Sequence, residues 1–339
     1  MLELPPVKQF VSDTGVRVYR IPFTFMPALS GRVYLLLEAG PPTLVDAGNG
    51  QEAAVRDIFK GLEAVRAEFD ENIRVSDIRR FLVTHAHVDH VGGLWRLAQQ
   101  TSAEVLAHAL DARRISAIEE RGTLAERALL RFLKHSGVPP EEYAQIIDVE
   151  RNPRQYVRSI PVDRIIADGE QLDGLEFIHT PGHSPGHLCI RVGNILITGD
   201  HVLLRTVPQI WPESTAPYTG LGHYLDSLAK VRRLCGIELA LGGHEPPVRN
   251  FYRRIDEIEA SHRRRLDRLM GILRKAPRPL SVYEITQQMY SVQKGFHTML
   301  ALSDVGSRVE YLDERGFLSV ANLDEFEGQD LPVYRYRPA

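Results

Sequence analysis

Several sequence features that would by themselves indicate a cellular location or a class of protein are scarce in this 339-residue chain. There are only two cysteines, Cys189 and Cys235, too few for a disulfide-rich secreted scaffold. Both stand in apolar contexts and are predicted to be buried thiols, with a disulfide between them left open. No run approaches the roughly 18 apolar residues of a membrane span, and Met1–Pro6 lacks the basic and apolar regions of a secretory signal. We therefore expect a cytoplasmic protein.

An excess of charge of one sign is also missing. The chain has 41 Lys and Arg against 44 Asp and Glu, a formal net charge of −3. No global field therefore draws it to nucleic acid or to an anionic membrane. The hydrophobic content of 43% is typical of a globular protein, and the length allows one large domain and one small one.

Histidine, by contrast, is concentrated in one heptad. Residues 84–90 read Thr-His-Ala-His-Val-Asp-His and follow an apolar, β-like run. Imidazole and carboxylate together suit zinc and neighbouring transition metals. His85 and His87 are two residues apart, so an extended backbone points both to one side. Asp89 and His90 then turn towards a second position. A neutral polar loop at the start of a helix rarely holds four potential ligands so densely.

Three more candidate ligands each follow a short apolar run. His183 lies in Thr-Pro-Gly-His-Ser-Pro-Gly-His, Asp200 ends Ile-Leu-Ile-Thr-Gly-Asp, and His244 lies in Leu-Gly-Gly-His-Glu-Pro-Pro. Each stands where a strand would stop and a loop begin. A glycine beside each permits a tight backbone turn. Ligands that are far apart in the sequence can therefore converge on one rim of a sheet.

Together these motifs resemble the metallo-β-lactamase superfamily over about residues 15–250. The family's elements stand, in the family's order, at Asp46, 85–90, His183, Asp200 and His244. One heptad alone is a moderate signal, but five elements in order are a strong one. His87 stands where the flavodiiron oxidoreductase branch usually has Glu, which favours the hydrolytic branches.

The resemblance implies two divalent metal ions, with zinc as the default and iron or manganese also suited to these ligands. It assigns His85, His87 and His183 to metal one, Asp89, His90 and His244 to metal two, and Asp200 to both. Asp46 would hold a ligand imidazole in the required tautomer, with a turn residue ahead of Gly48 as the alternative. His187 and His201 are interpreted as neighbours of the ligands or as pocket wall.

Such a metal pair predicts a reaction mechanism. Two cations about 3.5–4 Å apart hold a hydroxide between them and lower the pKa of water towards neutrality. Asp200 would orient this nucleophile and handle its proton, and Asp89 would act through metal two, which stabilises the leaving group. Asp89 and Asp200 are thus the predicted catalytic carboxylates, and no covalent enzyme intermediate is expected.

The fold implied by the resemblance is an αββα sandwich of the α/β class. Strands are predicted at 17–21, 32–37, 42–45, 78–83, 104–107, 164–166, 175–180, 188–192 and 195–198, with helices at 51–69 and 92–100. A helical insertion at 109–155, interrupted by Pro139-Pro140, separates the first two ligand motifs. We predict that it caps the metal site and shapes substrate choice. A peripheral helical decoration is the alternative.

Residues after Asp200 carry a weaker prediction. Residues 203–217 should form an irregular loop, and a helix then begins near His223. His223 or Tyr224 could contact substrate or stabilise an oxyanion. Tyr224 also has the spacing of a core-facing residue on this helix, so both interpretations stay open.

The chain divides into a catalytic domain at 1–250 and a linker helix with a small domain at 251–339. Apolar residues from Phe251 to Leu273 recur at steps of three and four, as on one helix face. The other face carries Arg253, Arg254, Arg263, Arg264, Arg265 and Arg268. Such a run is usually a solvated face paired with acids, although it could touch phosphates.

A winged-helix-like module is predicted after this helix. Helices are expected at 281–290 and about 297–314, and a hairpin at 316–320 and 332–336. Residues 281–339 contain five Lys or Arg and nine Asp or Glu, whereas phosphate-binding domains present a basic face. Docking, substrate shaping or contact within a homo-oligomer fits this charge better than DNA binding.

Three functions compete. The first is a dinuclear metal hydrolase of a small ester, thioester or lactone. The second is an endoribonuclease or other phosphodiesterase, since some relatives with a C-terminal winged helix cleave RNA. The third is a mononuclear iron persulfide dioxygenase, against which the intact His90 and His244 speak. A small molecule is the expected partner, and nucleic acid is disfavoured without being excluded.

Overall fold

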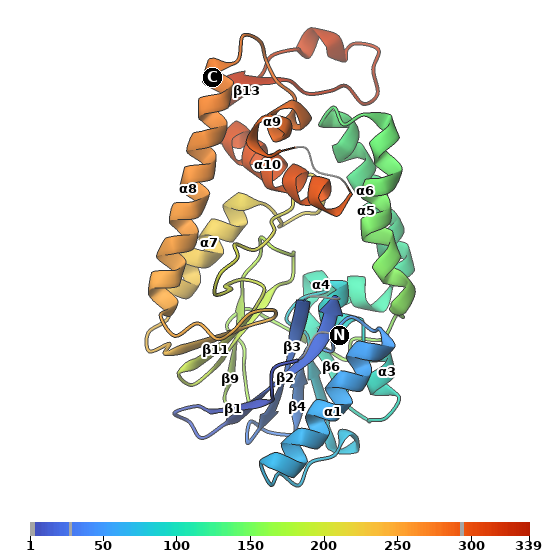
Figure 1. Cartoon of the computed structure of the whole chain (residues 1–339), viewed down its shortest axis with the longest axis vertical. Coiled ribbons are helices and arrows are strands. Elements are labelled where there is room, and N and C mark those ends of the chain that lie inside the picture. Colours follow the sequence, from blue (N-terminus) through green and yellow to red (C-terminus); the bar gives the residue numbers. More distant parts are fainter. Residues whose placement is uncertain (1–3, 27–28, 292–294) are drawn as a thin grey trace.

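A computed structural model describes residues 4–26, 29–291 and 295–339 and contains two β-sheets packed face to face (Figure 1). The larger sheet has strands β1 (Lys8–Val11), β2 (Arg17–Met26), β3 (Leu29–Leu37), β4 (Thr43–Val45), β5 (Arg80–Leu82), β6 (Glu104–His108) and β7 (Arg164–Ile166) in chain order. The smaller has the order β12 (Leu239–Gly242), β11 (Ile195–Gly199), β10 (Leu188–Val192), β9 (Leu175–His179) and β8 (Gln171–Leu172). Helices cover the outer faces, so the predicted layered α/β architecture is confirmed.

Successive side chains along a strand point to opposite faces of its sheet and so pack into different layers. On β2, Tyr19, Ile21 and Phe23 join the outer core against α1 (Glu52–Glu68). Val18 points the other way, into the core between the two sheets, as the period of two in a strand requires. A third core lies between the smaller sheet and the helices α7 (Leu221–Arg232) and α8 (Phe251–Lys275).

Parallel strand pairs bring the predicted ligands to one rim. β4 runs parallel to β5, and β11 runs parallel to β12. Because parallel neighbours end at the same edge of a sheet, the loops after them meet. Asp46 follows β4, the histidine heptad follows β5, Asp200 follows β11, and His244 lies two residues beyond β12.

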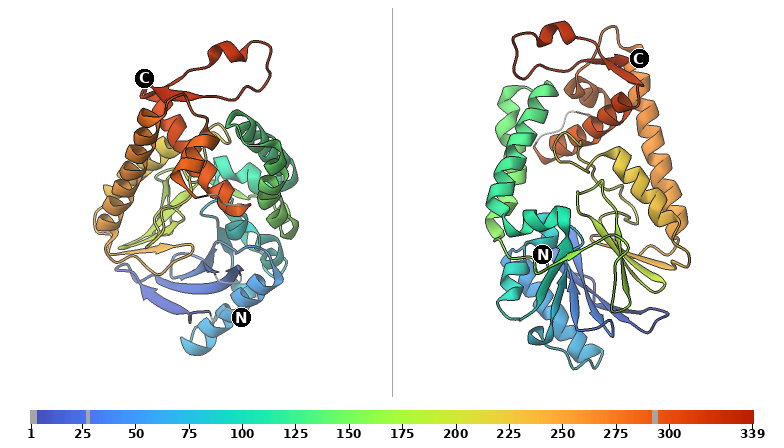
Figure 2. Two further views of the ribbon diagram at one scale, coloured as in Figure 1. Left: turned by 45° about the horizontal axis from the view of Figure 1, so that its top comes forward. Right: turned by 180° about the vertical axis from the view of Figure 1, so that it is seen from behind.

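The insertion and the C-terminal segment share a fourth apolar core. The insertion forms α4 (Ala109–Ser116), α5 (Ile118–His135) and α6 (Tyr143–Arg151). The C-terminal segment adds α9 (Val282–Met289), α10 (Phe296–Glu314), β13 (Leu318–Val320) and β14 (Tyr336–Pro338). Leu129 and Phe132 of α5 pack with Leu302 and Val305 of α10, and Figure 2 shows α5 and α6 beside α10. We call this assembly of α5, α6 and residues 265–291 and 295–339 the upper unit.

Some predicted elements differ from the observed ones. The helix predicted at 92–100 is the shorter α3 (Leu94–Ala98), and a further helix, α2 (Val88–Val91), precedes it within the heptad region. β1 was not predicted, because its four residues are mostly exposed and carry no apolar period. The second hairpin strand lies later than predicted, at β14, and pairs antiparallel with β13. The winged-helix assignment stays a prediction.

One prediction about burial was wrong, and another holds only in part. Cys189 is buried, but Cys235 is exposed, and both are free. The arginine face of α8 is not uniformly solvated, because Arg254 is buried and donates to the carbonyls of Leu203 and Thr206. Among the described helices, none is both long and apolar enough to cross a membrane.

Candidate metal centre

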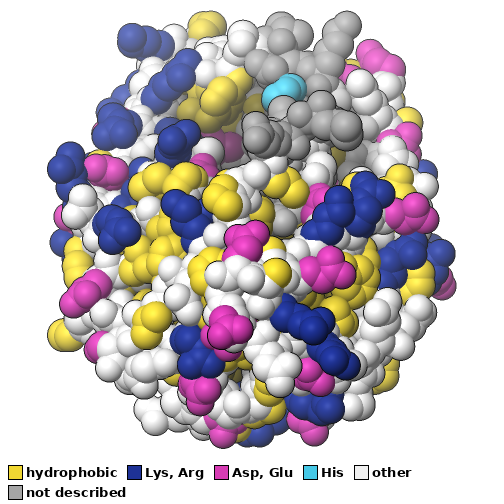
Figure 3. All heavy atoms as spheres, turned by 60° about the horizontal axis from the view of Figure 1, so that its bottom comes forward, with side chains coloured by type: hydrophobic (Ala, Val, Ile, Leu, Met, Phe, Trp, Pro, Cys, Tyr) yellow, Lys and Arg dark blue, Asp and Glu magenta, His cyan; other side chains and the backbone are white. Residues whose placement is uncertain are grey.

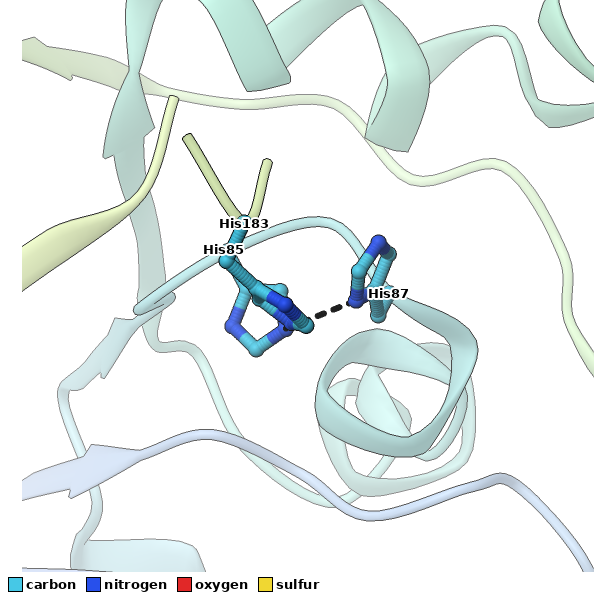
Figure 4. A group of neighbouring side chains, drawn as sticks. All are labelled: His85, His87 and His183. Carbon is cyan, nitrogen blue, oxygen red and sulfur yellow. Dashed lines mark hydrogen bonds between the residues drawn. The ribbon is translucent and has the colours of Figure 1, made fainter. Parts of the chain in front are cut away.

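Three histidines form a first group at the rim (Figure 4). His87 precedes α2 with an extended backbone, φ −73° and ψ 149°. His85 Nε2 lies 3.0 Å from His87 Nδ1 and 3.3 Å from His183 Nε2. Three imidazole nitrogens from two loops therefore converge on one point, as the sequence predicted for metal one.

Asp89, His90, Asp200 and His244 form a second group, with their ligand atoms within 4.8 Å of one another. His244 Nε2 lies 3.1 Å from Asp89 Oδ2 and 3.2 Å from Asp200 Oδ2. Asp200 Oδ2 also lies 3.7 Å from His183 Nε2 of the first group. The carboxylate of Asp200 thus stands between the two groups, and all seven predicted ligands are brought together.

The donor atoms fit divalent ions. Ligand atoms about 2.0–2.1 Å from a tetrahedral zinc ion lie about 3.3 Å from each other, close to the separations within each group. His90 Nε2 and Asp200 Oδ1 are buried with no hydrogen-bond partner in the described part of the chain, which is costly unless an ion binds them. Nitrogen and oxygen donors of this kind suit zinc, iron or manganese.

The protonation of the two groups differs. Burial and the neighbouring imidazoles lower the pKa of His85 well below its usual value, so it is neutral and ready to ligate. In the second group, carboxylates outweigh burial: Asp200 and Asp89 raise the pKa of His244 to about 10, and Asp46 leads the groups that raise the pKa of His90. An ion entering the second group must therefore displace protons.

Asp46 orients the imidazole of His90 through its Nδ1 atom. Its Oδ2 lies 2.8 Å from His90 Nδ1, and its Oδ1 accepts from the backbone N–H of Thr84 at 2.8 Å. The residue adopts φ 61°, a left-handed conformation that aspartate tolerates better than most residues. With Nδ1 donating to Asp46, the Nε2 lone pair of His90 faces the second group.

The variant Asp46→Asn should lower the affinity for one metal ion by about 10- to 100-fold, because an amide NH₂ cannot accept from His90 Nδ1–H. Competition titration with a chromogenic chelator measures this affinity. Asp57→Asn is the matched control, since Asp57 likewise accepts from the backbone and hydroxyl of a threonine, Thr24, away from the rim. Equal affinity in Asp46→Asn and the parent protein would contradict the role assigned to Asp46.

The sequence analysis missed Asp111, which ties the two ligand loops together. This buried residue on α4 accepts from the backbone N–H of Ala86 at 2.8 Å and of Gly186 at 3.0 Å. Its Oδ2 is also 3.4 Å from the hydroxyl of Ser184. Its only local signal is an acid in the first turn of a helix, which usually indicates a favourable helix-end charge. The structure gives it a long-range role instead.

The remaining candidates have distinct places. His187 Nε2 accepts from the backbone N–H of Asp200 at 3.1 Å, so it fixes the turn that carries this ligand. His201 is buried, and neither of its ring nitrogens has a partner in the part of the chain that the structure describes. Tyr224 is fully buried in the core between the smaller sheet and helices α7 and α8, and it donates to the His201 carbonyl at 2.8 Å, which favours its core-facing interpretation. His223 is half-buried, 3.1 Å from Glu213.

Comparison with known proteins gives the family. A family model described as "Metallo-beta-lactamase superfamily" matches residues 26–273, and the chain belongs to this superfamily of metal-dependent hydrolases. The "Probable metallo-hydrolase YqjP" of Bacillus subtilis (strain 168) is 23% identical over 89% of this chain and 93% of its own. The "Beta-lactamase-like protein 2 homolog" of Caenorhabditis elegans is 24% identical, over 90% of this chain and 85% of its own.

Solved structures agree. The metallo-beta-lactamase family protein TTHA1429 from Thermus thermophilus superposes with a TM-score of 0.74 at 26% identity, covering 95% of this chain and 98% of its own. A beta-lactamase domain protein from Burkholderia ambifaria gives a TM-score of 0.74 at 24% identity, over 98% and 94% of the two chains. Because the two superpositions cover 95% and 98% of this chain, the structural similarity extends over the upper unit as well as the sandwich.

Proposed function

We propose that the protein is a hydrolase dependent on two divalent metal ions, acting on a small ester, thioester or lactone. The observation that carries the proposal is the position of Asp200 between two complete ligand groups. When bound, the two ions supply a hydroxide at neutral pH and polarise the bond under attack.

The protein's own residues hold and direct this chemistry. Asp200 would orient the attacking water and handle its proton, and its backbone is fixed because its N–H donates to His187 Nε2. Asp46 and the Gln209 carbonyl orient His90 and His183 through their Nδ1 atoms, at 2.8 and 2.7 Å. Because these partners are in place before substrate arrives, little reorganisation accompanies the reaction.

Surface charge supports a small substrate over RNA. On the face of the sandwich turned forward in Figure 3, Lys and Arg side chains are mixed with Asp and Glu side chains. In the α8 arginine run, Arg253 lies 3.1 Å from Glu257 and Arg265 lies 2.9 Å from Asp304. These ion pairs neutralise part of the positive charge of the arginine run, so less of it is free to bind a phosphate backbone.

A substrate panel tests the proposal. Metal-loaded protein is assayed on 4-nitrophenyl butyrate, a butyryl thioester, γ-butyrolactone and a single-stranded oligoribonucleotide, beside His85→Asn and the remote control His135→Asn. We expect hydrolysis of at least one of the first three, lost in His85→Asn and kept in His135→Asn. Inertness towards all three would sink the proposal, and metal-dependent RNA cleavage would replace it with the nuclease alternative.

A further inference from the structure

A cavity of about 550 Å³ lies at the C-terminal end of α8, in the upper unit. This volume is within the range of small-molecule sites. Figure 1 shows this end of α8 in the upper part of the molecule, where Leu269 and Leu273 share an apolar core with Ile285 of α9. The cavity is lined by α8, by the loop that follows it and by Gln288 of α9. None of the candidate metal ligands lines it, so it is separate from the metal centre.

Gly271 lines this cavity and has no local reason to be glycine. Inside a helix, glycine is less favourable than alanine, because its backbone loses more freedom on folding. Every other glycine of the chain has either a positive φ or a neighbouring atom within 4 Å of the place where a β-carbon would lie. Gly271 has neither, and a β-carbon there would meet open space. The effect of the glycine is therefore to keep part of the cavity unfilled.

Two unpaired cations flank Gly271 on one face of α8. Arg268 lies one turn before it and Lys275 one turn after it, so the three positions form a row. Both cations line the cavity, and neither makes an ion pair or a hydrogen bond within the part of the chain that the structure describes. The negative end of a helix dipole favours cations in the last turn, which accounts for Lys275 but not for Arg268. A third cation, Arg278, is already paired, since it lies 2.7 Å from Glu284.

Apolar residues form much of the remaining lining. Ile272 and Ala276 are half-buried, and Leu280 is buried. Gln288 adds an uncharged amide from α9. Among the described residues no acid lines the cavity, although residues 281–339 contain nine Asp or Glu and five Lys or Arg. The cavity thus combines two free positive charges with an apolar surface.

We infer that this cavity binds a small phosphate monoester with an apolar body. Such a phosphate carries a charge of about −1.5 to −2 at pH 7, which two cations can balance, whereas a carboxylate balances only one. Arginine offers paired donors to phosphate oxygens, and lysine binds phosphate as a point charge. Because Gly271 has no side chain, an anion can approach α8 between Arg268 and Lys275. The site does not depend on the proposed hydrolysis.

Calorimetric titration of the metal-loaded protein with hexyl phosphate tests this inference, beside inorganic phosphate and hexanoate. Hexyl phosphate should bind at least about tenfold more tightly than either other probe, because only it has both the phosphate and the apolar body. Gly271→Leu fills the cavity, and the double variant Arg268→Gln with Lys275→Gln removes both charges. Each should weaken the binding of hexyl phosphate by about 10- to 100-fold.

A matched control and a stability measurement separate this role from general damage. Arg274→Gln removes an exposed cation of α8 that does not line the cavity, and it should bind hexyl phosphate as the parent protein does. Gly271→Leu should keep the melting temperature, since nothing lies within 4 Å of the added β-carbon and leucine favours a helix more than glycine.

The same variants distinguish the cavity from the metal centre. Metal ions also attract phosphate, but binding at the metal centre would be unchanged in Gly271→Leu and in the double variant. An affinity for hexyl phosphate within threefold of the parent value in these two proteins would therefore overturn the inference. An equal loss in Arg274→Gln, or hexyl phosphate binding no tighter than inorganic phosphate, would overturn it as well.

Discussion

Replacement of Asp200 by asparagine should lower kcat by a factor on the order of 10³ and reduce the bound metal. The carboxylate stands between the two ligand groups, with Oδ2 3.7 Å from His183 Nε2 of the first and 3.2 Å from His244 Nε2 of the second. Asparagine keeps the size and one oxygen but loses the negative charge. The charge matters most here, because the nearby imidazoles lower the pKa of Asp200 well below its usual value despite burial.

The backbone of this variant should stay in place, because the N–H of Asp200 still donates to His187. An unchanged melting temperature of the metal-free protein would separate lost chemistry from lost folding. Asp168→Asn serves as the control, since that exposed carboxylate pairs with Lys230 on the surface. A kcat within threefold of the parent value would show that Asp200 does not bridge the two groups.

Replacement of Asp304 by alanine should lower the free energy of unfolding by about 3–5 kcal/mol. Arg308 has no exposed side-chain surface and lies 2.6 Å from Asp304. Asp304 also lies 2.9 Å from Arg265 on α8 and accepts from the hydroxyl of Tyr290 at 2.5 Å. Without Asp304, a buried guanidinium would keep no carboxylate partner, which is the costly arrangement.

His262 cannot compensate for that loss. Its Nδ1 lies 3.0 Å from Arg308 Nη2, and burial, followed by the Arg308 charge, lowers the pKa of His262 to about 3. A neutral imidazole accepts a hydrogen bond but offers no balancing charge. The double variant with Asp304→Leu and Arg308→Met should recover much of the lost stability, because both charges leave together.

Urea denaturation of the chain measures these changes. Asp324→Ala, on an exposed segment, should change the free energy of unfolding by less than about 0.5 kcal/mol. A loss below about 1 kcal/mol for Asp304→Ala would contradict the account of the upper unit. The unit also reaches the metal centre, since Ser303 accepts from Gln209 Nε2 at 3.0 Å and the Gln209 carbonyl holds His183.

The metal-binding residues could be predicted because their signals are local. His85, His87, Asp89 and His90 stand in one heptad, and the other ligands each follow an apolar run with a glycine beside them. Because parallel neighbouring strands end at the same edge of a sheet, residues in such positions come to lie together. The assignment of these ligands to two groups came from the family resemblance, because the spacing of the residues along the chain does not determine it.

Residues that act through contacts between distant segments escaped prediction. Asp111 joins loops 25 and 75 residues away from it, and nothing in its neighbours along the chain signals this. The sequence predicted helices in the regions of α5 and α10, but not that Phe132 packs onto Gly306.

The most direct test of the central claim is elemental analysis of the desalted protein after metal loading. The account predicts two divalent ions per chain, and one ion per chain when His183→Ala removes a ligand of the first group. One ion or none in the parent protein would contradict the paired centre on which the proposed reaction depends.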